Sequence, residues 1–260
     1  MVKFPLAILL MMILVGPQEP ANRRITFGTG EEITYRVHYG FINAATARMV
    51  VSDDIHYLDG KPCMKIDVYG KSIGMFDLFA NIEDNWGTYF DTIHHRPVRF
   101  YRMLQEGRYR KNEIVNFDHS NNLARTREYS FSANSWKPIV ASKVPNDVQD
   151  LVSGYYFLRT IDFSESKAGD IITMDAFFDK EIYDFKIRVV GREMVNTSLG
   201  KIRSIVLSPI MPENSLFDGE NSVRVWISDD INKVPLKIKA RMFVGAVEVD
   251  IESFSKGEIK

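Results

Sequence analysis

The chain has 260 residues, of which 45% are hydrophobic and 26% are charged, and its formal net charge is -1. This composition is typical of a globular protein and excludes a disordered or fibrous chain. Neither sign of charge forms a long block, so the sequence lacks the clustered positive surface of a duplex-binding domain, and we expect no nucleic-acid partner.

The first element is an N-terminal apolar segment. Leu6–Val15 is an uninterrupted apolar run preceded by Lys3. A membrane-spanning helix needs roughly twenty apolar residues, whereas this shorter run fits the core of a secretory signal. We therefore predict a signal peptide at residues 1–21, with an uncleaved anchor that attaches the protein to a membrane as the alternative. Residues 22–260 are predicted to be a single β-rich domain, exported to the periplasm or the cell exterior.

The stretch 30–51 carries the clearest strand pattern. Large apolar residues alternate with polar ones up to Tyr39, and after a break at residues 40–43 the alternation resumes with Ala45, Ala47 and Met49. A period of two is typical of a strand with one buried face. Small residues at positions where a core strand normally carries large ones indicate close packing, against either a neighbouring sheet or a ligand.

Period-two segments continue to the C-terminus, separated by turn residues such as Asp59-Gly60 and Gly107. We predict about twelve strands among the segments 25–27, 33–39, 45–51, 55–57, 63–69, 86–91, 98–106, 109–118, 123–129, 136–140, 171–178, 183–190, 202–208, 223–227, 236–242 and 247–251. Residues 72–81 break the alternation and fit one helical turn or a hydrophobic loop.

One longer helix is predicted from Asp147 to about Thr160, with Asn146 as its N-cap and Gln149 completing a capping box. Its apolar residues recur with helical spacing. Because strands and helices do not alternate, a doubly wound sheet is excluded. We predict an all-β, mainly antiparallel domain, built as a curved pair of sheets or an open β-barrel and capped by this helix near residues 147–160.

The last two strands form a hairpin with a predicted register. With Gly245-Ala246 as a two-residue turn, apolar residues face each other and so do opposite charges. The predicted pairs are Val244 with Val247, Met242 with Val249, Ala240 with Ile251, Arg241 with Asp250, and Lys239 with Glu252.

Motifs of established catalytic sites are missing from the sequence, including G-x-S-x-G, H-E-x-x-H and C-x-x-C. His94 and His95 are adjacent, so on a strand they point to opposite faces, and we expect solvated side chains. The lone Cys63 is expected to be a small buried hydrophobe. We expect no metal and no cofactor.

Two groups of residues are candidates for binding. A curved sheet closed by one helix can leave an apolar cavity, although the same residues fit tight packing equally well. The candidate ligand-binding residues are Tyr39, Ala45, Ala47, Phe76, Phe79 and Trp86. The candidate patch for an anionic lipid headgroup is Arg99, Arg102, Arg108 and Arg110, with a solvated hairpin that protects a sheet edge as the alternative.

Three motifs in order resemble one family of exported bacterial proteins, domain of unknown function family 3108. They are Y-R-V-H-Y-G-F-I-N-A-A-T-A near the start, F-D-H-S-N-N-L in the middle, and V-W-I-S-D-D-I-N-K-V-P-L-K-I near the end. Ala45 stands where the family usually has glycine. The resemblance implies a secreted or periplasmic β-rich domain and brings no catalytic residues with it.

Three functions remain open. The leading hypothesis is a non-enzymatic cell-envelope protein that binds a lipid, another amphipathic ligand or an envelope partner. The second is a hydrolase or glycan-modifying enzyme that uses carboxylates such as Asp84 and Asp229. The third is a structural or assembly factor that acts through exposed edge strands.

Overall fold

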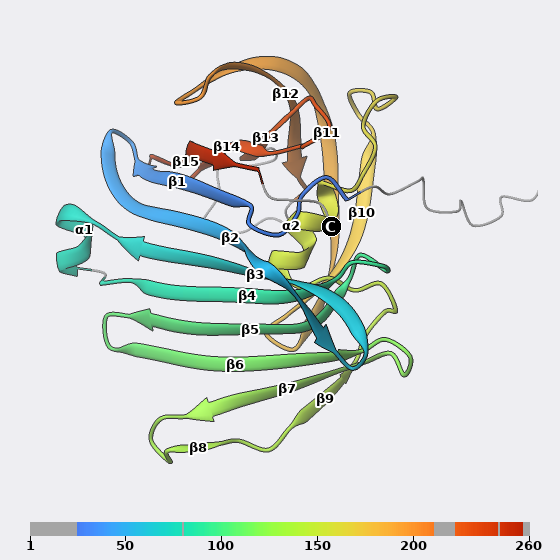
Figure 1. The fold of residues 1–260 in the computed structure, drawn as a ribbon. Helices are drawn as coiled ribbons and strands as arrows, with labels where there is room; N and C mark the ends of the chain where they lie inside the picture. The colour runs from blue at the N-terminus through green and yellow to red at the C-terminus, as the bar shows by residue number, and fades with distance from the viewer. Residues whose placement is uncertain (1–24, 80, 211–221, 244, 257–260) are drawn as a thin grey trace, which may run out of the picture.

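The computed structural model describes residues 25–79, 81–210, 222–243 and 245–256. Within these residues the protein is one open antiparallel sheet with two helices, so the predicted all-β open architecture is confirmed (Figure 1). The predicted signal peptide lies outside the described residues. No helix in the described part of the chain is long and apolar enough to cross a membrane.

The sheet has fifteen strands in the order β10-β11-β12-β13-β14-β15-β1-β2-β3-β4-β5-β6-β7-β8, and β9 pairs with β7. The strands are β1 (Glu32–Tyr39), β2 (Ile42–Leu58), β3 (Lys61–Ser72), β4 (Glu83–Asp91), β5 (Pro97–Glu106), β6 (Tyr109–Asp118), β7 (Leu123–Ser130), β8 (Ser135–Trp136), β9 (Val140–Lys143), β10 (Ile171–Phe178), β11 (Glu181–Thr197), β12 (Gly200–Pro209), β13 (Val223–Ser228), β14 (Pro235–Arg241) and β15 (Ala246–Ser255). The helices are α1 (Gly74–Phe79) and α2 (Leu151–Leu158).

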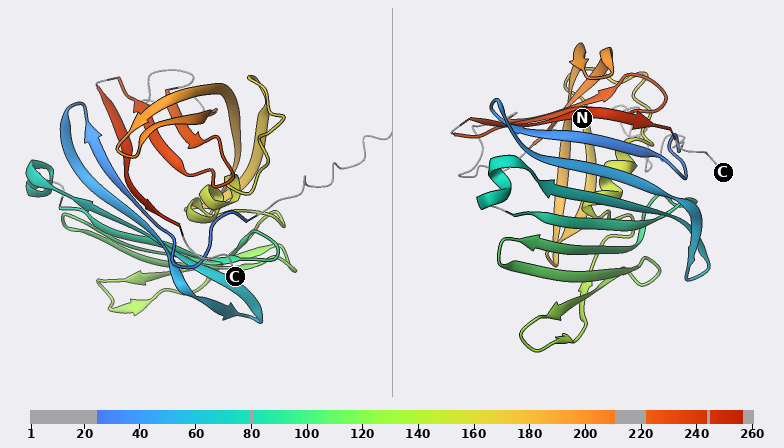
Figure 2. Two further views of the ribbon diagram at one scale, coloured as in Figure 1. Left: turned by 45° about the horizontal axis from the view of Figure 1, so that its top comes forward. Right: turned by 60° about the vertical axis from the view of Figure 1, so that its left-hand side comes forward.

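The sheet curves around α2, which lies against its concave face (Figure 2). Apolar side chains at alternate strand positions point inward and form the main core with the helix. Tyr156 of α2 is buried there against Phe27, with ring centroids 4.6 Å apart. A second cluster on β11, β12 and β13 packs against Phe163, which follows α2 in the chain. The helix therefore joins the two halves of the curved sheet.

The start of α2 differs from the prediction. The helix begins at Leu151, and its N-cap is Asp150 rather than Asn146. Gln149 is held in extended backbone, because its N–H donates to the carbonyl of Asp175 and its carbonyl accepts from the N–H of Phe177, both at 2.8 Å. Pairing with β10 thus replaces the first helical turn that the sequence pattern indicates.

The register of the β14–β15 hairpin also differs from the prediction. Ala240 faces Val247 and Lys239 faces Glu248, because β15 already begins at Ala246, which the prediction placed in the turn. The N–H of Met242 donates to the carbonyl of Gly245 at 3.1 Å within this connection. The shift is even-numbered, so each side chain keeps its predicted face of the sheet. The prediction for Val244 lies outside the described residues.

Candidate functional site: an apolar groove beside α2

An apolar groove of about 360 Å³ lies between α2 and the concave face of the sheet. Strands from distant parts of the sequence contribute to it, because β14 and β15 pair next to β1 and β2. Its lining residues are Tyr35, Ala47, Met49, Val68, Trp86, Leu151, Val152, Tyr155, Ile238 and Val249. Apart from Tyr35, Tyr155 and the indole of Trp86, the lining side chains are wholly apolar. We call this feature the apolar groove.

The floor of the groove contains the small residue Ala47, and its strand partner Gly70 lies just outside the lining. Ala47 on β2 pairs with Tyr35 on β1 and with Gly70 on β3. Neither Ala47 nor Gly70 fills the space above the sheet, and nothing lies within 4 Å of a Cβ atom built on Gly70. The space above Ala47 is faced by α2 rather than by a second sheet. The small residues therefore leave room for the groove.

A pair of tyrosines provides the polar atoms of the groove. The Tyr35 hydroxyl donates to the carbonyl of Pro235 at 3.1 Å, so the Tyr155 hydroxyl donates to Tyr35 across 2.8 Å. Burial raises the pKa of both phenols well above the usual value. Both are neutral at physiological pH, and the groove therefore presents no charge to the apolar part of a ligand.

Trp86 closes one side of the groove, and its ring packs against the buried side chain of Arg102. Its ring stacks on Phe178, with centroids 6.0 Å apart, and the Arg102 guanidinium lies 5.4 Å from its ring centre. Arg102 forms an ion pair with Glu113 at 2.9 Å and another with Asp179. The charge of Arg102 is therefore neutralised inside the protein, and its contribution is to fix the indole.

The structure separates the four arginines that the sequence analysis grouped as a headgroup patch. Arg102 is buried on the concave face, whereas Arg99 is exposed and donates to Asn116 at 2.7 Å. Arg108 and Arg110 are exposed at the far end of the same hairpin. Arg102 shares its strand face with Phe100 and Leu104, and this alternation was the sequence signal for its burial.

Two of the six candidate ligand residues line the groove, namely Ala47 and Trp86. Ala45 lies farther along β2 and is partly exposed. Tyr39 and Phe76 pack edge to face, with centroids 6.5 Å apart, and Phe79 is exposed on α1. Tyr35, Met49 and Val68 lie on the strand of Ala47 or on its two neighbours and were not singled out. Ile238, Val249 and the three residues of α2 were missed because they are distant in sequence, and only the tertiary fold brings them to Ala47.

The two carboxylates considered for hydrolysis lie at opposite ends of the sheet. Asp84, near the start of β4, accepts the N–H of Gln105 at 3.0 Å. Asp229, in the β13–β14 connection, forms ion pairs with Arg203 at 2.8 Å and with Arg192 at 3.3 Å. They do not share a cleft, so this pair does not have the geometry of acid and base acting on one bond.

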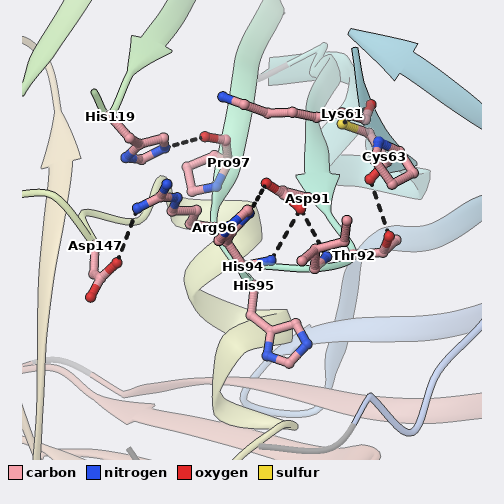
Figure 3. A network of polar contacts seen from close by, with 12 residues as sticks. Lys61, Cys63, Asp91, Thr92, His94, His95, Arg96, Pro97, His119 and Asp147 are labelled. Carbon is pink, nitrogen blue, oxygen red and sulfur yellow. Dashed lines mark hydrogen bonds and ion pairs between the residues drawn. The ribbon is translucent and has the colours of Figure 1, made fainter. Parts of the chain in front are cut away.

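The histidines near β4 are structural groups. Figure 3 shows His94 turned toward Asp91 and His95 pointing the other way. The Nδ1 atom of His94 lies 2.8 Å from the Asp91 carboxylate, and the His95 ring stacks on Phe90. Burial acts to raise the pKa of Asp91, but the hydrogen bonds from His94 and two backbone N–H groups lower it overall. Cys63 nearby is buried, as expected. In the described ranges no three His, Cys, Asp or Glu side chains are grouped to hold a metal ion.

Asp150 fixes α2 over the groove and has an unusual pKa. Its carboxylate accepts from Val152 N and Ser153 N, each at 2.8 Å, and from the Thr88 hydroxyl at 2.7 Å. Burial raises its pKa from 3.8 to about 6, and these hydrogen bonds only partly oppose the effect.

The raised pKa of Asp150 predicts how stability depends on pH. Between pH 4 and 6 the folded state binds a proton at Asp150 that the unfolded state does not, so this residue's contribution to stability is full below pH 4 and is lost as the pH rises through 6. Asn at the N-cap keeps an acceptor without a charge. Asp150→Asn is expected to stabilise the protein by up to about 3 kcal/mol at pH 7 relative to pH 4, at about 1.36 kcal/mol per pKa unit.

Urea unfolding of both proteins at pH 4 and pH 7 measures this difference. Groups titrating elsewhere cancel, because they are common to both proteins. An Asn variant whose stability relative to the parent is the same at the two pH values would show that Asp150 has an ordinary pKa.

Comparisons with known proteins identify a family and a similar fold, and none of the matches states a function. The family model described as "Protein of unknown function (DUF3108)" matches residues 34–252. No curated protein matches the chain. The chain resembles the crystal structure of a β-barrel-like protein of domain of unknown function DUF1849 from Brucella abortus, with 9% identity, a TM-score of 0.54, and coverage of 89% of this chain and 99% of that chain.

Two further solved structures are more distant in shape. One is a proposed exported protein with a YmcC-like fold from Bacteroides fragilis, with 9% identity, a TM-score of 0.35, and coverage of 90% of this chain and 100% of that chain. The other is a proposed lipoprotein from Parabacteroides distasonis, with 9% identity, a TM-score of 0.33 and the same coverage of each chain. The resemblance to the Brucella protein supports a barrel-like fold and carries no activity with it.

Proposed function

Because the chain belongs to the DUF3108 family, whose description states no function, we propose from the apolar groove that it is a non-enzymatic binding protein of the cell envelope. Its ligand is an amphipathic molecule whose apolar chain enters the groove and whose polar end remains outside. Export is supported by the apolar segment Leu6–Val15, which has the length of a signal core.

The observation that carries the proposal is the lining of the groove. A space of about 360 Å³ falls within the size range of small-molecule sites, which are mostly apolar with few polar groups. Each methylene group buried there contributes about 0.8 kcal/mol. Both tyrosines are neutral, so the groove has no charged side chain that could pair with a charged substrate. A linear or branched hydrocarbon chain therefore fits this lining better.

The separation of Asp84 from Asp229 supports binding over hydrolysis, because the two acids cannot act on one substrate. The groove itself has no carboxylate, histidine, serine or cysteine among its lining residues. Its side chains offer shape and apolar surface instead of proton transfer or a nucleophile.

Two measurements test the proposal. The protein purified from its bacterial host is extracted with organic solvent and examined by mass spectrometry, and we expect an amphipathic lipid in stoichiometric amount. A separate sample of folded protein, freed of lipid, is titrated with N-phenyl-1-naphthylamine, whose fluorescence rises in apolar sites. We expect saturable binding that a long-chain fatty acid displaces. Absence of both an extracted lipid and saturable probe binding would overturn the proposal.

A further inference from the structure

One end of the sheet carries exposed apolar side chains on three separate connections. Phe41 lies between β1 and β2 and is 97% exposed, and α1 between β3 and β4 contributes Leu78 at 81% and Phe79 at 83%. Met75 of α1 and Phe243 between β14 and β15 are also exposed. Antiparallel pairing brings these connections to the same end of the sheet, on the left of Figure 1. We call these five residues the open rim.

The open rim carries more exposed apolar side chains than the other end of the sheet, whose connections contribute Ile93 and Ile231. The connections at the other end, 59–60, 92–96, 119–122 and 229–234, are rich in charged and turn-forming residues, such as Asp59, Arg96 and Asp230. In the described part of the rim connections that carry these side chains, Asp77 is the one acid. Its carboxylate accepts the hydroxyl of Ser72 at 2.6 Å.

The rim side chains are exposed on three connections of the sheet. On α1, Phe76 turns inward and packs on Tyr39, while Leu78 and Phe79 face outward. Large apolar side chains this exposed match the interfacial layer of a bilayer, into which apolar side chains enter about 5–10 Å.

Charged residues beside the rim are consistent with a phospholipid surface. Exposed bases lie at the adjoining strand ends and turn, namely Lys71, Arg108, Arg110 and Arg241, and exposed acids there are Glu83 and Glu106. Bases near a membrane surface attract anionic headgroups by about 1 kcal/mol each. The acids offset part of this attraction, so apolar insertion provides the larger share.

We propose that the open rim docks on the surface of a phospholipid bilayer and inserts Phe41, Leu78 and Phe79 among the lipids. Docking in this orientation places the rim end of the concave face next to the membrane, with Ala45 and then Ala47 at increasing distance along β2. This membrane-docking role of the open rim extends the proposed function of the groove. Vesicle binding does not require an occupied groove, so the docking proposal and the binding proposal can fail separately.

The test places a fluorescent probe in the rim of the full-length protein. Phe41→Trp is mixed with vesicles of phosphatidylethanolamine and phosphatidylglycerol that contain a brominated phosphatidylcholine, which quenches tryptophan in contact with acyl chains. The matched control is Ile93→Trp, an exposed apolar position at the opposite end of the sheet. Both are compared with the parent protein, whose three tryptophans provide the common background.

We expect severalfold stronger quenching for Phe41→Trp than for Ile93→Trp. Adding Leu78→Asp and Phe79→Asp to Phe41→Trp is expected to weaken vesicle binding at least about tenfold, because each removes one large apolar side chain from the lipid phase. Urea unfolding of that variant is expected to match that of Phe41→Trp, which shows that it folds whether or not the groove binds the probe.

Several outcomes would overturn the membrane surface. Equal quenching at both ends would mean that the N-terminal segment or nonspecific contact holds the protein on vesicles. An emission of Phe41→Trp that vesicles leave unchanged would show that the rim does not insert. A dimer in solution that Leu78→Asp and Phe79→Asp dissociate would assign the rim to a second copy of the chain instead.

Discussion

Glu31→Ala is expected to lower the free energy of unfolding by about 3–5 kcal/mol, the largest stability change that we predict. Both carboxylate oxygens of Glu31 accept hydrogen bonds from Arg159, at 2.5 Å and 2.9 Å. The two side chains are almost fully buried, at 0% and 1% exposure. Removing the carboxylate leaves a guanidinium buried without its counter-charge, which is why the expected cost is large.

The position of this ion pair explains its structural role. Arg159 follows the last residue of α2, and it also donates to the carbonyl of Asn232 in the β13–β14 connection at 3.2 Å. Its guanidinium lies over the rings of Phe27 and Tyr156, at 5.1 Å and 5.2 Å. Burial acts to lower the pKa of Arg159, but Glu31 raises it overall, so the arginine stays charged. The pair thereby connects the start of β1, the end of α2 and a distant turn.

Glu32→Ala is the matched control, because the neighbouring carboxylate also pairs with an arginine. Glu32 contacts Arg48 at 2.7 Å, but these side chains are 38% and 50% exposed. Such surface pairs contribute about 0–1 kcal/mol. Urea unfolding of both variants measures the contrast. Similar losses for Glu31→Ala and Glu32→Ala would contradict the assignment, whereas replacing both Glu31 and Arg159 by Met is expected to restore much of the stability.

The fold could be predicted from local patterns because each strand and tight turn is recorded in adjacent residues. Asp59-Gly60 illustrates this, since both residues adopt the positive φ that the turn requires, 50° and 74°. The errors arose where distant segments compete with local preference. Residues 147–150 have a helical pattern, yet Gln149 pairs with β10 instead. The predicted register of the β14–β15 hairpin was wrong, because opposite charges also face each other when the strands are shifted by an even number of residues.

The candidate site was only partly predictable for the same reason. Ala47 and Trp86 stand out in the sequence as a small and a large residue at inward strand positions. Their neighbours Ile238 and Val249 lie more than 150 positions away from either residue, and no local pattern assigns β15 to the edge of β1. Likewise, Glu31 and Arg159 are separated by 128 positions. Long-range strand order, which the sequence alone does not reveal, assembles both the groove and its supporting ion pair.

Ala47→Trp is expected to weaken binding of N-phenyl-1-naphthylamine at least about tenfold, equivalent to about 1.4 kcal/mol. The indole would project from the groove floor toward α2 and occupy the space between Tyr35 and Trp86 that the proposed ligand needs. Because the new side chain enters existing space, we expect the free energy of unfolding to fall by no more than about 1–3 kcal/mol, the usual cost of an overpacked site. Fluorescence titration and urea unfolding measure the two effects separately.

Thr46→Trp is the control for the groove substitution, because adjacent residues on β2 point to opposite faces of the sheet. Thr46 pairs with Arg36 and Lys71, outside the groove lining. A tryptophan there adds the same side chain to the same strand and should leave probe binding unchanged. If Ala47→Trp folds and binds the probe as tightly as Thr46→Trp does, the ligand does not occupy the apolar groove. A loss confined to Ala47→Trp would place the ligand between α2 and the floor of the sheet, where the small side chain of Ala47 leaves room for it.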